Sequence, residues 1–195
     1  MLSSIHPLGE RAKRNRYWLT ATAHVMGAVF GGAVLGAAAG AIGLLLEPLS
    51  PRWLALLAAG VCAILLVAAT SSRPLPSWRR QVNEDWLTAY RGWVYGFGFG
   101  AQLGMGVVTI VTSPVVYAVV AVAVLTGSLP AAVAIGAVFG VIRGATLLAA
   151  AAVDTPDRLR SLHRRLQRLA APVDKVAVGG LGVAAIVLGT TGVVA

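Results

Sequence analysis

The sequence predicts an all-α integral membrane protein with about five transmembrane helices, or six as the alternative. Hydrophobic residues make up 57% of the chain and charged residues only 12%, whereas a soluble domain averages about 25% charged. The apolar runs are long enough to span a bilayer, which takes about 20 residues each. Glycine is abundant, with 23 residues, and small residues let transmembrane helices pack closely.

The first apolar run begins after a basic tail at residues 1–16 and extends over residues 18–46. This run exceeds the 7–15 residues typical of a signal peptide core, so we expect a retained helix. Its glycines recur at GxxxG spacing, which predicts a face for tight helix packing. Two prolines in residues 47–52 then predict a turn, and a second crossing is expected over residues 53–69.

The central part of the chain begins with a basic segment at residues 71–91. Within it, residues 77–90 fit either an interfacial amphipathic helix or a solvated loop. Residues 92–127 are uncharged and rich in glycine. We expect one full crossing, a break near Ser113 and Pro114, and a shorter apolar piece, because proline removes a backbone donor and clashes with the preceding turn.

The last part of the chain contains a crossing at residues 131–153, a basic segment at 154–175 and a final crossing at 176–194. Leucines at spacings of three and four lie between arginines in the basic segment. That pattern predicts an amphipathic linker helix on the membrane surface.

Charge distribution predicts the topology. Basic loops favour the cytoplasmic side, so the three basic segments are expected there. The N-terminus is then cytoplasmic in a multi-pass protein of the inner membrane. Residues 92–127 are expected to cross once overall, since a second crossing would place residues 154–175 outside. Residues 114–127 are then either re-entrant or the continuation of a long tilted helix. The chain is expected to be one polytopic domain over 1–195, whose halves, 16–90 and 91–195, resemble a tandem two-helix repeat.

Arg143 lies near the middle of its apolar run, where an arginine costs about 2.5–3.5 kcal/mol on insertion scales. It must snorkel, join a hydrogen-bond network, or meet an anionic solute or partner. The other polar residues of the apolar runs could line a hydrated path or bond only to carbonyls of their own helix. The candidates for a substrate pathway are Gln102, Thr109, Thr112, Ser113, Pro114, Tyr117 and Arg143.

The arginines that flank the apolar runs are expected to contact anionic lipid headgroups. The candidates are Arg79, Arg80, Arg158, Arg164, Arg165 and Arg168. Because nearly all the arginines and lysines behind the net charge of +9 lie in three short segments beside the apolar runs, a nucleic-acid partner is not expected. A homo-oligomer or a membrane-complex partner is expected instead.

No cofactor or metal site is expected. A single cysteine, Cys62, excludes an internal disulfide and a cysteine-based zinc site. His24 is the one histidine in an apolar run, so it has no partner for a bis-histidine haem site. The sequence also contains no nucleotide-binding or zinc-protease motif, and an enzymatic activity has no positive support.

The segment GMGVVTIVTSPVVYAVV, residues 104–120, resembles the broken-helix motif of the CcdA/DsbD type of membrane thiol–disulfide electron carriers. That family carries a cysteine beside its proline, whereas Pro114 is flanked here by Ser113 and Val115. Thiol exchange requires a cysteine pair, so the family's redox activity does not carry over. The resemblance implies only a scaffold of paired broken helices around a central cavity.

These observations together predict a small-solute membrane permease or exporter, with an anionic solute or a lipid as candidate substrates. The alternative is a non-catalytic membrane subunit or an assembly scaffold of a larger complex. The broken glycine-rich helices, Gln102 and Arg143 favour the first hypothesis, and the GxxxG faces with the basic amphipathic helices favour the second.

Overall fold

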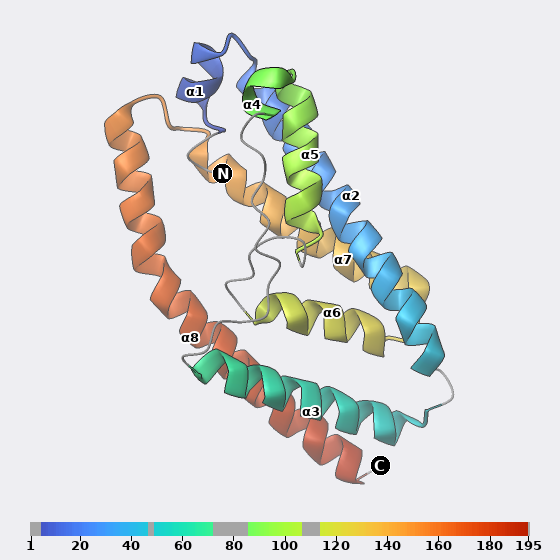
Figure 1. The fold of residues 1–195 in the computed structure, drawn as a ribbon. Coiled ribbons are helices and arrows are strands. Elements are labelled where there is room, and N and C mark those ends of the chain that lie inside the picture. Colours follow the sequence, from blue (N-terminus) through green and yellow to red (C-terminus); the bar gives the residue numbers. More distant parts are fainter. Residues whose placement is uncertain (1–4, 47–48, 72–85, 107–113, 195) are drawn as a thin grey trace.

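A computed structural model describes residues 5–46, 49–71, 86–106 and 114–194, and within these ranges it contains helices and no strands (Figure 1). Apolar and glycine-rich runs form the long elements, because a helix satisfies every backbone polar group internally. In chain order the elements are α1 Pro7–Ala12, α2 Tyr17–Gly43, η1 Leu44–Leu46, α3 Pro51–Thr70, α4 Trp86–Ala89, α5 Gly92–Gly104, α6 Val115–Leu125, α7 Leu129–Ala145, η2 Thr146–Ala150 and α8 Pro156–Val194.

Four helices among the described residues are long and apolar enough to cross a membrane. They are α2 with η1, α3, α7 with η2, and α8 over Pro156–Thr190. The sequence predictions of helices over 18–46, 53–69 and 131–153 are confirmed to within a few residues. The all-helical class is therefore confirmed, with four candidate spans and the shorter apolar helix α6.

Helix α2 packs between α5 and α7, and glycines line both seams. A Cβ added at Gly31 would overlap the carbonyl oxygen of Ala101 on α5, and one added at Gly32 would overlap the carbonyl oxygen of Gly136 on α7. Backbones come this close only where side chains are absent. The GxxxG spacings are thus packing faces, as the sequence predicts.

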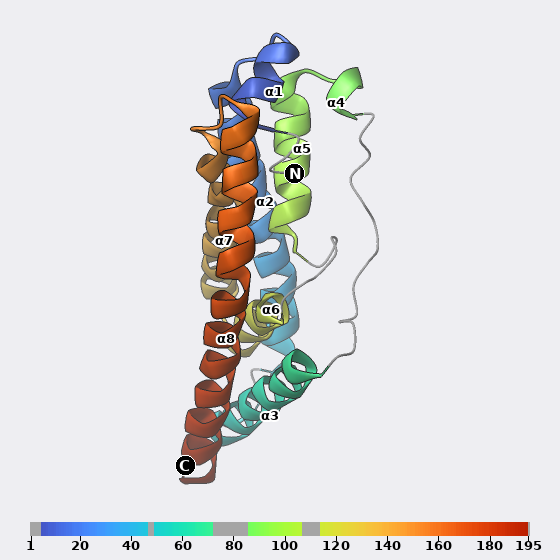
Figure 2. The same cartoon turned by 90° about the vertical axis from the view of Figure 1, so that its left-hand side faces the viewer.

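Helices α3 and α8 form a second packed pair, joined to the first group through α6. Helix α8 runs along almost the whole length of the molecule, and its C-terminal half lies against α3 (Figures 1 and 2). The side chains of its first half are mostly exposed. Helices of residues 16–90 therefore pack mainly on helices of residues 91–195, although the predicted repeat of the two halves stays a prediction.

The prediction of one full crossing before a break at Ser113 and Pro114 is wrong in its first part. Helix α5 has only 13 residues and ends at Gly104, which gives about 20 Å at 1.5 Å per residue. Gly106 has a φ of 57°, a left-handed conformation open to glycine that ends a helix readily. Ser113 lies outside the described residues, and Pro114 immediately precedes α6.

The predicted division between a surface helix at 154–175 and a separate crossing at 176–194 is also wrong. Helix α8 is continuous over 39 residues and includes Pro172. The alanines before this proline have a high helix propensity, and the valine after it is not a turn-forming residue. One proline then removes a single backbone bond without ending the helix. Of residues 77–90, the structure describes only those from Trp86 on, which include α4. The choice between an interfacial amphipathic helix and a solvated loop over 77–90 therefore stays open.

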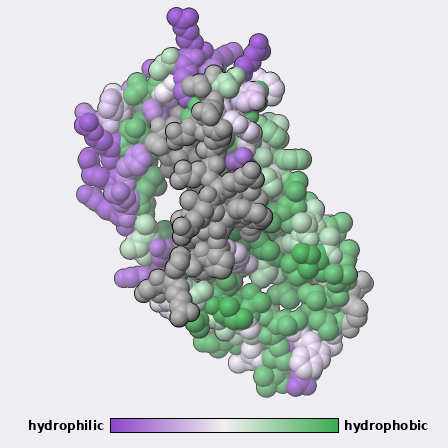
Figure 3. All heavy atoms as spheres, viewed as in Figure 1, coloured by the Kyte–Doolittle hydropathy of each residue, from purple (hydrophilic) through white to green (hydrophobic). Residues whose placement is uncertain are grey.

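One end of the molecule carries a part of each basic segment. Helix α1, helix α4 and the beginning of α8 lie at this end in both views, while α3 and the C-terminal part of α8 lie at the other end (Figures 1 and 2). Figure 3 shows hydrophilic residues gathered at this first end and along the first half of α8, and hydrophobic residues over the lower helices. We call this first end the basic end.

Candidate functional site

Glu10 is buried at the basic end, where α1 docks onto α2 and α5. Its side chain is 0% exposed. The hydroxyl of Tyr95 donates to Oε1 at 2.5 Å, and the hydroxyl of Thr20 donates to Oε2 at 2.9 Å. Asn15 Nδ2 in turn donates to the Tyr95 hydroxyl at 3.1 Å. A buried carboxyl needs such partners because leaving it unbonded away from water is costly.

Apolar residues pack around this polar cluster. Ile5, Tyr17, Tyr95, Phe99 and Leu147 belong to one buried cluster that joins the chain before α1 to α2, α5 and η2. The Tyr17 hydroxyl donates to the carbonyl oxygen of Leu147 at 3.2 Å. Short α1 is too small to be stable alone, so these contacts hold it in place.

A cavity of about 680 Å³ opens beside the Glu10 cluster, between α1 and the first turns of α2. Arg11 and Arg16 line it, together with Asn15 and the aromatic side chains of Tyr17 and Trp18. Neither arginine forms an ion pair within the described part of the chain. The cavity is therefore a positively charged pocket with an aromatic wall.

His24 lies one helical turn beyond Thr20 on α2 and is 1% exposed. Its Nδ1 has no hydrogen-bond partner among the described residues. Within the same ranges, no group of three or more His, Cys, Asp or Glu side chains comes together. Cys62, on α3, is a half-buried free thiol.

The predicted pathway residues lie on three different helices. Gln102 is half-buried near the end of α5, Pro114 and Tyr117 are half-buried at the start of α6, and Arg143 lies in the last turn of α7. Thr109, Thr112 and Ser113 lie outside the described residues. The role of this set stays a prediction.

Arg143 lies against an aromatic ring. Its Cζ is 5.3 Å from the ring centroid of Phe139, one turn earlier on α7, a geometry that attracts a guanidinium to the face of the ring. Thr146 donates to the Arg143 carbonyl oxygen at 2.6 Å. No acidic residue of the described ranges pairs with this arginine. The aromatic contact was not among the partners expected from the sequence, although a spacing of four places two residues side by side on a helix.

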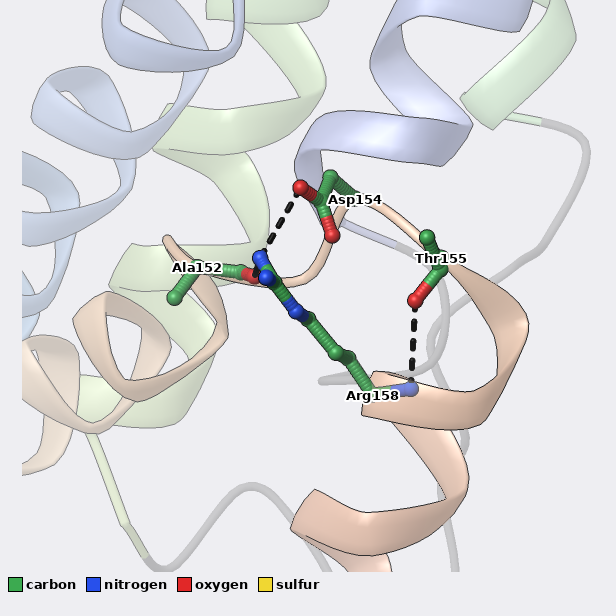
Figure 4. A network of polar contacts seen from close by, with 4 residues as sticks. All are labelled: Ala152, Asp154, Thr155 and Arg158. Carbon is green, nitrogen blue, oxygen red and sulfur yellow. Dashed lines mark hydrogen bonds and ion pairs between the residues drawn. The ribbon is translucent and has the colours of Figure 1, made fainter.

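Among the predicted lipid-contact residues, the side chain of Arg158 is held by residues that precede α8. Figure 4 shows its Nη1 donating to Asp154 Oδ2 at 2.9 Å and to the Ala152 carbonyl oxygen at 3.3 Å, while its backbone nitrogen donates to Thr155 Oγ1 at 3.4 Å. Arg164, Arg165 and Arg168 are exposed and form no ion pair in the described part. Arg79 and Arg80 lie outside the described residues.

No model of a known protein family and no solved structure matches the chain. Curated proteins do match it. Methylamine utilization protein MauF of Paracoccus versutus is 30% identical over 192 residues, which cover 94% of this chain and 69% of that protein. This chain belongs to the MauF family. The protein of the same name from Paracoccus denitrificans is 31% identical over 93% of this chain and 67% of its own length.

A MauF family member from Methylophilus methylotrophus is 34% identical over 145 residues, or 72% of this chain and 51% of its own. The chain thus spans from about half to about two thirds of the length of these curated relatives.

Two predictions from the sequence are corrected by this family membership. The resemblance to CcdA/DsbD-type carriers is wrong, because the matching relatives are named MauF. Glycine and proline are both more frequent in transmembrane helices than in soluble ones, so their combination does not identify a family. The predicted permease or exporter is contradicted as well, since the relatives are named for methylamine utilization, and no finding specifically supports the alternative of a subunit or scaffold.

The sequence analysis did not identify Glu10, Tyr95 or the adjacent cavity. Glu10 stands 85 residues from Tyr95 along the chain, so no local pattern links them. One signal was available, because Glu10 is the sole acidic residue in an otherwise basic tail. Its buried position depends on how α1 folds back onto α2 and α5.

Proposed function

We propose that this chain takes part in methylamine utilisation from within the inner membrane of the cell. The observation that carries the proposal is the 30% sequence identity with the MauF protein of Paracoccus versutus, which extends over 94% of this chain. Four apolar helices of sufficient length favour a membrane location. The proposal extends to about five crossings, with α5 and α6 together forming one of them.

The proposed topology places the basic end in the cytoplasm, together with the N-terminus. Basic segments favour the cytoplasmic side, and α1, α4 and the beginning of α8 share one end of the molecule. Alkaline phosphatase fused after residue 128 should be active, and phosphatase fused after residue 155 should be inactive. The reverse pattern would contradict the orientation.

A gene deletion in the native host tests the proposed function. We expect the deletion strain to lose growth on methylamine and to grow normally on succinate with ammonium. A plasmid copy should restore growth. If the strain consumes methylamine as before, or if the host never consumes it, the proposal is wrong.

Two glycine variants test whether growth on methylamine depends on the packing of α2 against α5. Gly100→Val places a side chain in the seam between α5 and α2, whereas Gly60→Val places one on α3 where a Cβ meets nothing within 4 Å. We expect the first variant to fail in complementation and the second to succeed. An immunoblot of the membrane fraction shows whether failure comes from loss of the protein.

A further inference from the structure

The cavity beside α1 is lined by two arginines, and neither forms an ion pair with an acidic residue of the described ranges. Arg11 and Arg16 both line it and are exposed. Glu10 is the only acidic residue among residues 1–16, and its two carboxylate oxygens are occupied by hydroxyls of Tyr95 and Thr20. The one carboxylate of residues 1–16 is therefore turned into the protein, and neither Arg11 nor Arg16 forms an ion pair among the described residues.

The rest of the lining suits a phosphate group. Asn15 also lines the cavity, and its Nδ2 has a second hydrogen besides the one that it donates to Tyr95. The Tyr17 hydroxyl is already bonded to Leu147, so the main donors are the two arginines, whose guanidinium groups bind phosphate oxygens in pairs of hydrogen bonds. The side chain of Arg16, which precedes α2, makes no capping bond to that helix. Binding of a ligand by Arg16 therefore removes no capping bond from α2.

An apolar row leads from the cavity along α2. Trp18 and Thr22 line the cavity, and Met26 and Phe30 follow at spacings of four, so that each residue lies beside the previous one in a row inclined to the helix axis. Trp18 is 64% exposed, Met26 61% and Phe30 56%. The row is about 18 Å long at 1.5 Å per residue, slightly more than half of a hydrocarbon core of about 30 Å. Tryptophan is also the residue that favours the headgroup level of a bilayer.

We propose that this cavity binds the phosphate group of an anionic phospholipid, with an acyl chain along the row of exposed side chains on α2. The positive charge of Arg11 and Arg16 favours an anionic headgroup. The apolar row on α2 favours a lipid over free phosphate, because only a lipid has an acyl chain to lie along it. This site is separate from the arginines of α8, which project from an exposed helix surface.

Native mass spectrometry of the full chain in a mild detergent tests the proposal. The protein is titrated with dioleoylphosphatidylglycerol and, in parallel, with dioleoylphosphatidylcholine, which has the same chains and no net charge. We expect one tightly retained phosphatidylglycerol per chain. Arg11→Gln combined with Arg16→Gln should weaken this binding about tenfold or more, because each basic group near an anionic lipid contributes separately.

The matched control is Lys13→Gln combined with Arg14→Gln. It removes the same charge from the same segment, but neither residue lines the cavity. It should retain the bound lipid. Single Arg11→Gln and Arg16→Gln variants and the melting temperature without added lipid separate a loss of binding from a loss of folding.

Three results would overturn the proposal: equal retention of both lipids, undiminished binding by the double arginine variant, or an equal loss in the control. Inorganic phosphate decides the source of the anion. Displacement of phosphatidylglycerol by phosphate, with a rise in melting temperature that the arginine variant lacks, would assign the cavity to the free anion and overturn the lipid assignment. Lipid retention in excess phosphate supports it.

Discussion

Substitution of Gly100 by alanine provides a direct test of the packing between α5 and α2. A Cβ at this position would overlap the carbonyl oxygen of His24, and would lie 2.8 Å from its carbonyl carbon and 2.9 Å from the nitrogen of Ala28. Ordinary van der Waals contacts of a Cβ lie at 3.4–4 Å. All three neighbours are backbone atoms, so no rotamer change relieves the overlap and the two helices must move apart.

The expected cost is about 1–3 kcal/mol for overpacking, reduced by the higher helix propensity of alanine, about 1 kcal/mol relative to glycine. Gly60→Ala on α3 is the matched control, because its Cβ meets nothing within 4 Å and only the propensity gain applies. A difference of about 2 kcal/mol between the two variants corresponds to roughly 4–8 °C in melting temperature for a chain of this size.

The assay is thermal unfolding of both purified variants in the same detergent, at the same protein and detergent concentrations. Gly100→Ala should unfold below the wild type, and Gly60→Ala should unfold at or above it. A Gly100→Ala protein that is as stable as Gly60→Ala would show that α2 and α5 are not in backbone contact in the folded chain, and the packing argument would fall.

Three further predictions concern single side chains. Glu10→Ala removes the acceptor of two buried hydroxyls and should lower the melting temperature more than Tyr95→Phe, at about 1–3 kcal/mol for each stranded group; an equal or smaller effect would contradict the buried cluster. A double-mutant cycle of Arg143→Met and Phe139→Leu should give a coupling free energy of about 0.5–2 kcal/mol, and strictly additive changes in stability would exclude the cation–π contact. Pro172→Ala should raise the thermal stability of α8, since a helix-interior proline costs up to about 3 kcal/mol, and a fall would assign a structural role to the proline.

Local sequence patterns predicted the parts of the fold that depend on length and hydrophobicity. The helices at 18–46, 53–69 and 131–153 follow from apolar runs and bounding prolines, and the glycine spacing identified faces of close contact. The early end of α5 and the continuity of α8 were missed because both depend on weak signals, a left-handed glycine in one case and a tolerated proline in the other.

The candidate site was less predictable for a different physical reason. Arg143 was recognised from its position in an apolar run, and its contact with Phe139 could have been read from their spacing. The Glu10 cluster instead joins residues far apart in the chain. Its existence follows from the docking of a six-residue helix, which no periodicity encodes.

The central position of α2 also has a consequence for biogenesis. Both of its partners, α5 and α7, follow it along the chain, so a ribosome completes α2 long before either exists. At about 5–20 residues per second, translation from residue 43 to residue 145 takes roughly 5–20 s. During that interval two glycine-lined surfaces of a nascent helix are open to lipid or to other proteins. Factors that shield small-residue surfaces of newly made helices should therefore affect the yield of this protein more than its stability once folded.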